Sequence, residues 1–131
     1  MDTKNEQGDT WIEDLLYPLL EVLESIEILE IYMFGLSRRQ FISNENGAAE
    51  PTWEYIIHIG TLLKAILEKY PMIFSNFSEV PWKKCVKIGK ALENGYWPFV
   101  YQLCWKFVSK GIVQIKSVVL DLLYYADALK I

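Results

Sequence analysis

Apolar side chains that recur at helical spacing constrain the fold of this chain more than any other feature. They form one face of a helix that is predicted to begin at Thr10 and to end near Gly35. Thr10 and Glu13 have the spacing of a capping box, and Pro18 predicts either a kink or the start of a longer helix at its own position. The apolar face comprises Leu15, Leu19, Val22, Leu23, Ile26, Leu29 and Met33. Such a face has to be buried against other helices.

Proline and glycine residues divide the rest of the chain into further helical segments. We expect helices over 51–70, 81–95, 98–111 and 112–129, with a short apolar connection at 72–77. The last helix is apolar nearly all round, which is typical of a helix at the centre of a bundle. The sequence contains neither strand-like alternation nor an internal repeat. It therefore predicts an all-α fold, a single compact bundle of about five helices with an apolar central C-terminal helix.

The length of 131 residues fits one domain, so a single helical domain is expected over 1–131. Within it, residues 1–9 are expected to form a disordered tail. The segment 37–50 has no periodicity and few side chains to bury, and it predicts a flexible loop. This loop begins with Arg38 and Arg39, the only two arginines in the protein.

Charge is divided unevenly along the chain, with nine acids and one lysine in the first 36 residues and a basic surplus after them. Two rows of like charge result, one on the first helix and one on the 81–95 helix. The acidic strip comprises Glu21, Glu24, Glu27 and Glu30, and the basic patch comprises Lys83, Lys84, Lys87 and Lys90. The rows either pair with each other inside the molecule or remain open to partners. The wide arc of the acids favours an exposed strip that binds a basic protein surface.

Nucleic acid is not an expected partner. The whole chain carries a net charge of −4, which opposes attraction to phosphates. The basic patch also lacks the interleaved aromatic and arginine side chains that read bases.

Aromatic residues are concentrated in the segment 96–107, which holds six of them in twelve positions. The members proposed for binding are Tyr96, Trp97, Phe99, Tyr101 and Trp105. On a helical wheel they surround the helix, so part of the segment is expected to form an interface, where Trp and Tyr are favoured. With the broad apolar arc of the first helix, this surplus predicts a homodimer whose seam is the first helix, the aromatic segment or both.

Candidates for chemistry are few, and they do not form a catalytic or metal-binding pattern. His58 is the only histidine, Asp121 interrupts an apolar helix, and Cys85 and Cys104 form no CxxC motif. A zinc site takes about four His, Cys or carboxylate ligands. No catalytic residue, metal site or cofactor is expected, and the sequence favours a protein that is not an enzyme.

A membrane span is not predicted, because the longest uncharged stretch, 94–105, has twelve residues and a span takes about 20. The N-terminus has no apolar signal sequence, which favours a cytoplasmic protein. For function, the sequence predicts a small non-enzymatic protein–protein interaction or regulatory adaptor domain that self-associates. The alternative is a helical bundle that binds an apolar small molecule or lipid between its aromatic helices.

Overall fold

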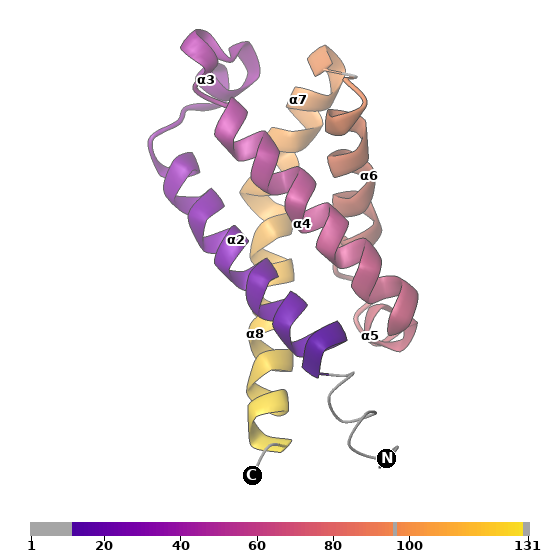
Figure 1. The fold of residues 1–131 in the computed structure, drawn as a ribbon. Coiled ribbons are helices and arrows are strands. Elements are labelled where there is room, and N and C mark those ends of the chain that lie inside the picture. The colour runs from indigo at the N-terminus through magenta and orange to yellow at the C-terminus, as the bar shows by residue number, and fades with distance from the viewer. Residues whose placement is uncertain (1–11, 96, 130–131) are drawn as a thin grey trace.

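The computed structural model describes residues 12–95 and 97–129. Within these ranges the chain is helical and contains no strand, which confirms the all-α prediction (Figure 1). The elements in chain order are η1 (Ile12–Leu16), α2 (Tyr17–Phe34), α3 (Arg38–Ser43), η2 (Glu45–Gly47), α4 (Glu50–Lys69), α5 (Pro71–Asn76), α6 (Trp82–Glu93), α7 (Trp97–Lys106), η3 (Phe107–Gly111) and α8 (Ile112–Leu129). The turns η1 and η3 are π-helical, and η2 is a 3-10 turn.

The start and end of α2 follow the signals in the sequence. Pro18 lies in the first turn of the helix, where its missing N–H group is not needed, so the prediction of a new helix start at this position is confirmed. Gly35 is the C-cap, and its backbone N–H donates to the carbonyl of Met33. Thr10 and the segment 1–9 lie outside the described residues.

The bundle is built around α4, which lies between α2 and α6 (Figure 1). The consecutive elements α7, η3 and α8 form the rest of the bundle. In this part α8 contacts α2, and α7 contacts α3 and α6. These helices share one apolar core. Its fully buried side chains include Val22, Ile26, Leu29, Ile56, Ile59, Leu63, Ile66, Cys85, Ile115 and Val119.

The C-terminal helix α8 is part of the bundle, but it is buried along only one face. Ile115 and Val119 of α8 are buried, but Leu120, Tyr124 and Tyr125 are exposed, and the end of the helix extends beyond the bundle (Figure 1). An apolar composition all round a helix is also produced by one buried face and one exposed apolar face. Composition alone therefore does not identify the central helix.

The closest approach of α4 and α6 occurs at two glycines. A Cβ atom added to Gly60 would lie 3.2 Å from the carbonyl oxygen of Cys85, and one added to Gly89 would lie 3.2 Å from that of Ile56. Both distances are shorter than ordinary van der Waals contact with backbone atoms that cannot rotate away. The absence of side chains at these two positions lets the helix backbones meet.

The segment 37–50 was predicted to be an irregular loop, and the structure corrects this prediction. A capping box begins α3, because the Gln40 backbone N–H donates to Ser37 Oγ and the Ser37 N–H donates to Gln40 Oε1. Phe41 in this helix and Ala49 after it are fully buried. The serine–glutamine spacing was visible in the sequence and could have revealed the helix. The flexibility of the segment stays a prediction.

Candidate protein-interaction surface

The outer face of α2 carries exposed residues at alternating spacings of three and four. We call this row the α2 stripe, and it comprises Tyr17, Leu20, Glu24, Glu27, Ile31 and Phe34. Its four large apolar side chains are exposed to 58% at Tyr17, 46% at Leu20, 74% at Ile31 and 95% at Phe34. Alternating three and four is the spacing with which one helix packs along another. Since the opposite face of α2 is already buried in the core, this helix has a second apolar face that is largely exposed and does not belong to the core of the described structure.

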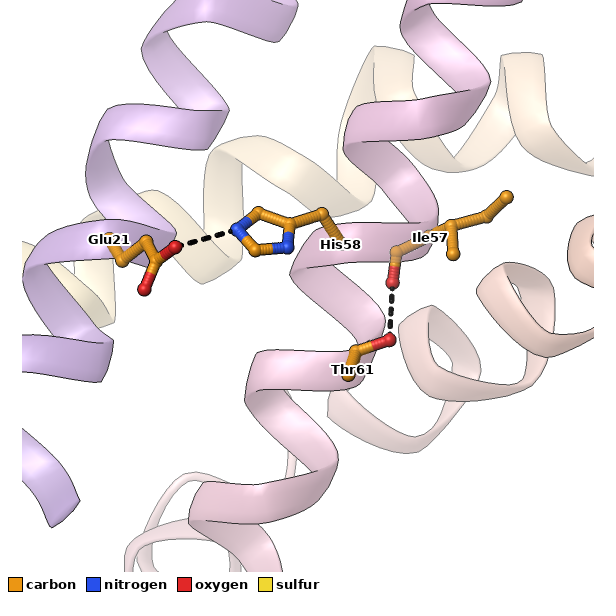
Figure 2. Close-up of polar contacts among 4 residues, drawn as sticks. All are labelled: Glu21, Ile57, His58 and Thr61. Carbon is orange, nitrogen blue, oxygen red and sulfur yellow. Dashed lines mark hydrogen bonds and ion pairs between the residues drawn. The ribbon is translucent and has the colours of Figure 1, made fainter.

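All four glutamates of the predicted acidic strip are exposed, but they differ in their contacts. Glu21 of α2 contacts His58 of α4 (Figure 2). The distance between Glu21 Oε1 and His58 Nε2 is 2.9 Å. Lys116 Nζ of α8 donates to Glu30 Oε1 at 2.7 Å. Glu24 and Glu27 are exposed and form no ion pair with a described residue. Two of the four acids thus connect α2 to its neighbours, and two remain on the outer face, at the middle of the stripe.

His58 and its surroundings have the character of a surface contact. The side chains of His58 and Glu21 are both about half exposed, and such a pair contributes about 0–1 kcal/mol. The nearby Thr61 hydroxyl donates to the Ile57 carbonyl of its own helix (Figure 2). Asp121 is exposed on α8. Among the described residues no group of three or more His, Cys, Asp or Glu side chains is placed to hold a metal ion.

The basic patch lies on the exposed face of α6, with α4 between it and α2 (Figure 1). None of Lys83, Lys84, Lys87 and Lys90 forms an ion pair with a described acid. Internal pairing of the two predicted charge rows is therefore absent from the described part of the chain. The lysines and the α2 stripe are separate surfaces.

The described members of the aromatic segment contact the edge of the core. Tyr101 is half-buried and its ring stacks on Trp53 of α4, with 4.3 Å between ring centroids. Trp105 is half-buried and its ring lies 5.5 Å from that of Phe41 in α3. Tyr96 and the side chains of Trp97 and Phe99 lie outside the described part of the chain. For Tyr101 and Trp105, the aromatic character is used at least in part for packing within the molecule.

The two cysteines are buried free thiols. Burial raises the pKa of Cys85 to about 12, with a smaller contribution from the neighbouring Cys104, and burial raises the pKa of Cys104 to about 12 as well. Because the thiolate is the nucleophile, neither cysteine is activated for chemistry near neutral pH.

A hollow of about 500 Å³ opens beside α5 and the start of α6. Its walls are mainly apolar, and two lysines contribute to the lining. The lining includes Leu67, Phe74, Val80, Trp82, Lys83 and Lys84. The size and apolar walls of this hollow suit the alternative function predicted from the sequence, the binding of an apolar molecule.

Membrane-spanning character and similarity to known proteins complete the description of these surfaces. No helix in the described ranges combines the length and the apolar character that crossing a membrane requires. The chain matches no protein-family model, no curated protein and no solved structure with which it was compared.

Proposed function

We propose that this protein is a non-enzymatic protein–protein interaction module whose docking face is the α2 stripe. The observation that carries the proposal is the exposure of four large apolar side chains at helix-packing spacing on a helix that is already anchored by its opposite face. Exposed apolar patches of this kind are typical of surfaces that bind other proteins. The spacing favours a helical partner that lies along α2.

The energetic scale of this face suits reversible binding. Complete burial of one large apolar side chain contributes about 1.5–3 kcal/mol, and association costs an estimated 4–15 kcal/mol before any net affinity results. Four such side chains, led by the highly exposed Ile31 and Phe34, are enough to offset a cost at the lower end of that range. We therefore expect a regulatory or adaptor contact that forms and dissociates.

Site-specific cross-linking tests the proposal. A photoreactive amino acid placed at Ile31 or Phe34 in the full chain is expected to capture a discrete partner in cells. The same amino acid at Met72 of α5, which is 72% exposed, is the control for exposure alone. Capture of the same proteins from Met72, or no capture from either α2 position, would contradict the proposal.

The homodimer expected from the sequence stays a prediction, and the α2 stripe bears on it directly. If two copies of α2 pair along the stripe, antiparallel pairing sets Glu24 of one copy against Glu27 of the other, and parallel pairing sets each glutamate against its own copy. Like charges at such short range repel each other. At neutral pH we therefore expect this face to prefer a different protein over a second copy, which sedimentation at micromolar concentration measures.

A second candidate function is the binding of an apolar small molecule or lipid in the hollow beside α5 and α6. The apolar walls formed by Leu67, Phe74, Val80 and Trp82 favour it, and Lys83 and Lys84 favour a negatively charged head group. Native mass spectrometry of freshly expressed protein is expected to show a co-purified molecule if this function is correct. A bare protein mass, with no binding of an added fatty acid, would count against it.

The cytoplasmic location also stays a prediction, which cell fractionation tests.

A further inference from the structure

The α2 stripe is not uniformly apolar, and its middle differs from its ends. Glu24 and Glu27 occupy the two central positions, and Leu20 and Ile31 flank them on either side. The whole stripe runs over 17 residue steps of α2, which is about 25 Å at the rise of an α-helix. A partner helix that covers the stripe along its length must therefore meet both apolar ends and both central carboxylates.

The two central carboxylates form no ion pair with a basic side chain in the described part of the molecule. The neighbouring acids Glu21 and Glu30 are already engaged by His58 and Lys116, whereas Glu24 and Glu27 form no ion pair with a described residue. A carboxylate that is covered by a partner without gaining a cation loses its hydration and is strongly destabilised. The positive charge has to be supplied by whatever covers the stripe.

From this arrangement we infer the class of partner, an inference that rests on the proposed function. The partner is an amphipathic helix of another protein with apolar residues at both ends of its contact face and lysine or arginine near the middle. The apolar ends supply the buried area, and the central charges supply the selectivity. The same carboxylates reject helices with an acidic centre, including α2 of a second copy.

Two synthetic peptides of about 20 residues each, long enough to cover the stripe, serve as probes. Both carry leucine at the ends of one heptad face, and they differ only in having lysine or glutamate at the two central positions. Fluorescence anisotropy with the full chain is expected to show the lysine peptide binding at least about tenfold more tightly than the glutamate peptide at low salt. The preference should decrease as salt is added, because exposed charges are screened.

Charge reversal at the stripe separates selectivity from general attraction. The variant with Glu24→Lys and Glu27→Lys is expected to reverse the preference and bind the glutamate peptide more tightly. A variant with Glu54→Lys and Glu68→Lys, two exposed acids of α4, has the same net charge and should keep the wild-type preference. If both control and stripe variants change the preference equally, the effect is long-range and the inference is wrong.

The remaining outcomes distinguish this inference from the proposed function. If both peptides bind the wild type equally and the variant with Ile31→Ala and Phe34→Ala binds neither, the stripe is a docking face but the carboxylates do not select, and only the inference fails. Failure of both peptides to bind also overturns the inference. In that case the cross-linking from Ile31 and Phe34 decides the proposed function independently.

Discussion

Gly60 and Gly89 are the residues at which the backbones of α4 and α6 meet, and neither position has room for a branched side chain unless a neighbouring backbone moves. We predict that Gly60→Val or Gly89→Val lowers the free energy of unfolding by about 1–3 kcal/mol, because an added side chain would force apart two backbones that are already at contact distance. Urea unfolding measures the loss. Gly35→Val is the matched control, since a Cβ atom there meets nothing within 4 Å. Valine variants of Gly60 and Gly89 as stable as the wild type would show that the helices separate at little cost.

The buried thiols give a prediction for alkaline pH. A cysteine in an unfolded chain loses its proton near pH 8.5, whereas burial holds the pKa of Cys85 and Cys104 at about 12. The unfolded state therefore releases protons first as the pH rises. The thiols' contribution to stability is complete below about pH 8.5 and declines above it, up to the folded pKa.

Thiol reactivity and unfolding measurements test this prediction. At pH 8, Ellman's reagent is expected to react slowly with the folded protein and rapidly after denaturation. The thermal midpoint of the wild type should also fall more steeply above pH 9 than that of the variant with Cys85→Ala and Cys104→Ala. Rapid reaction of the folded protein would mean that at least one thiol opens readily to solvent.

At the scale of the element, α2 combines a buried apolar face with the exposed α2 stripe, and we propose that the two glutamates in the stripe limit its self-association. We predict that Glu24→Leu with Glu27→Leu promotes dimer formation, because an uninterrupted apolar row replaces a repulsive centre. Each buried leucine contributes about 1.5–3 kcal/mol, so the dimer dissociation constant is expected to fall by more than about a hundredfold. Analytical ultracentrifugation measures the change.

The control for this experiment is a variant with the same composition. Glu54→Leu with Glu68→Leu places two leucines on the exposed face of α4 and should leave the sedimentation behaviour close to that of the wild type. If both variants associate equally, added hydrophobicity rather than the stripe causes the association. If the stripe variant sediments as the wild type does, the stripe is not a helix-pairing surface.

At the scale of the whole molecule, α4 separates the α2 stripe from the lysines of α6, so the two surfaces should function independently. We predict that Lys83→Glu, Lys84→Glu and Lys87→Glu together change binding of the lysine-centred peptide by less than about twofold at physiological salt, where exposed charges beyond about 8 Å are screened. The free energy of unfolding should change by no more than about 0.5 kcal/mol per substitution, since all three side chains are exposed. Anisotropy and urea unfolding measure these effects. A large loss of peptide binding would show that the peptide also contacts α6.

The sequence was sufficient to predict the helices whose signals are local. Pro18 and Pro71 mark helix boundaries, and apolar positions recur at helical spacing. Both signals are properties of a few neighbouring residues, and the corresponding helix ends agree closely with the structure. The position of a helix in the bundle depends on long-range packing instead. The periodicity of α4 did not show that α2 and α6 pack on either side of it.

The candidate surface was predictable only in part for the same reason. The sequence placed Glu21, Glu24, Glu27 and Glu30 on one helix, but it could not show that His58 and Lys116 engage the first and the last. These contacts join residues 37 and 86 positions apart. The exposure of Ile31 and Phe34 likewise became visible only when the buried face of α2 was known.

The placement of the acids and lysines on either side of α4 gives the described bundle an electric dipole, negative at α2 and positive at α6. At low ionic strength, where screening is weak, the field of a positively charged partner would turn such a molecule before contact so that α2 leads and α6 trails. Orientation of this kind raises the fraction of encounters that are productive and therefore acts on the association rate. Under the proposed function, dissociation is governed by the apolar ends of the stripe, so salt should slow the arrival of a partner much more than it hastens its departure.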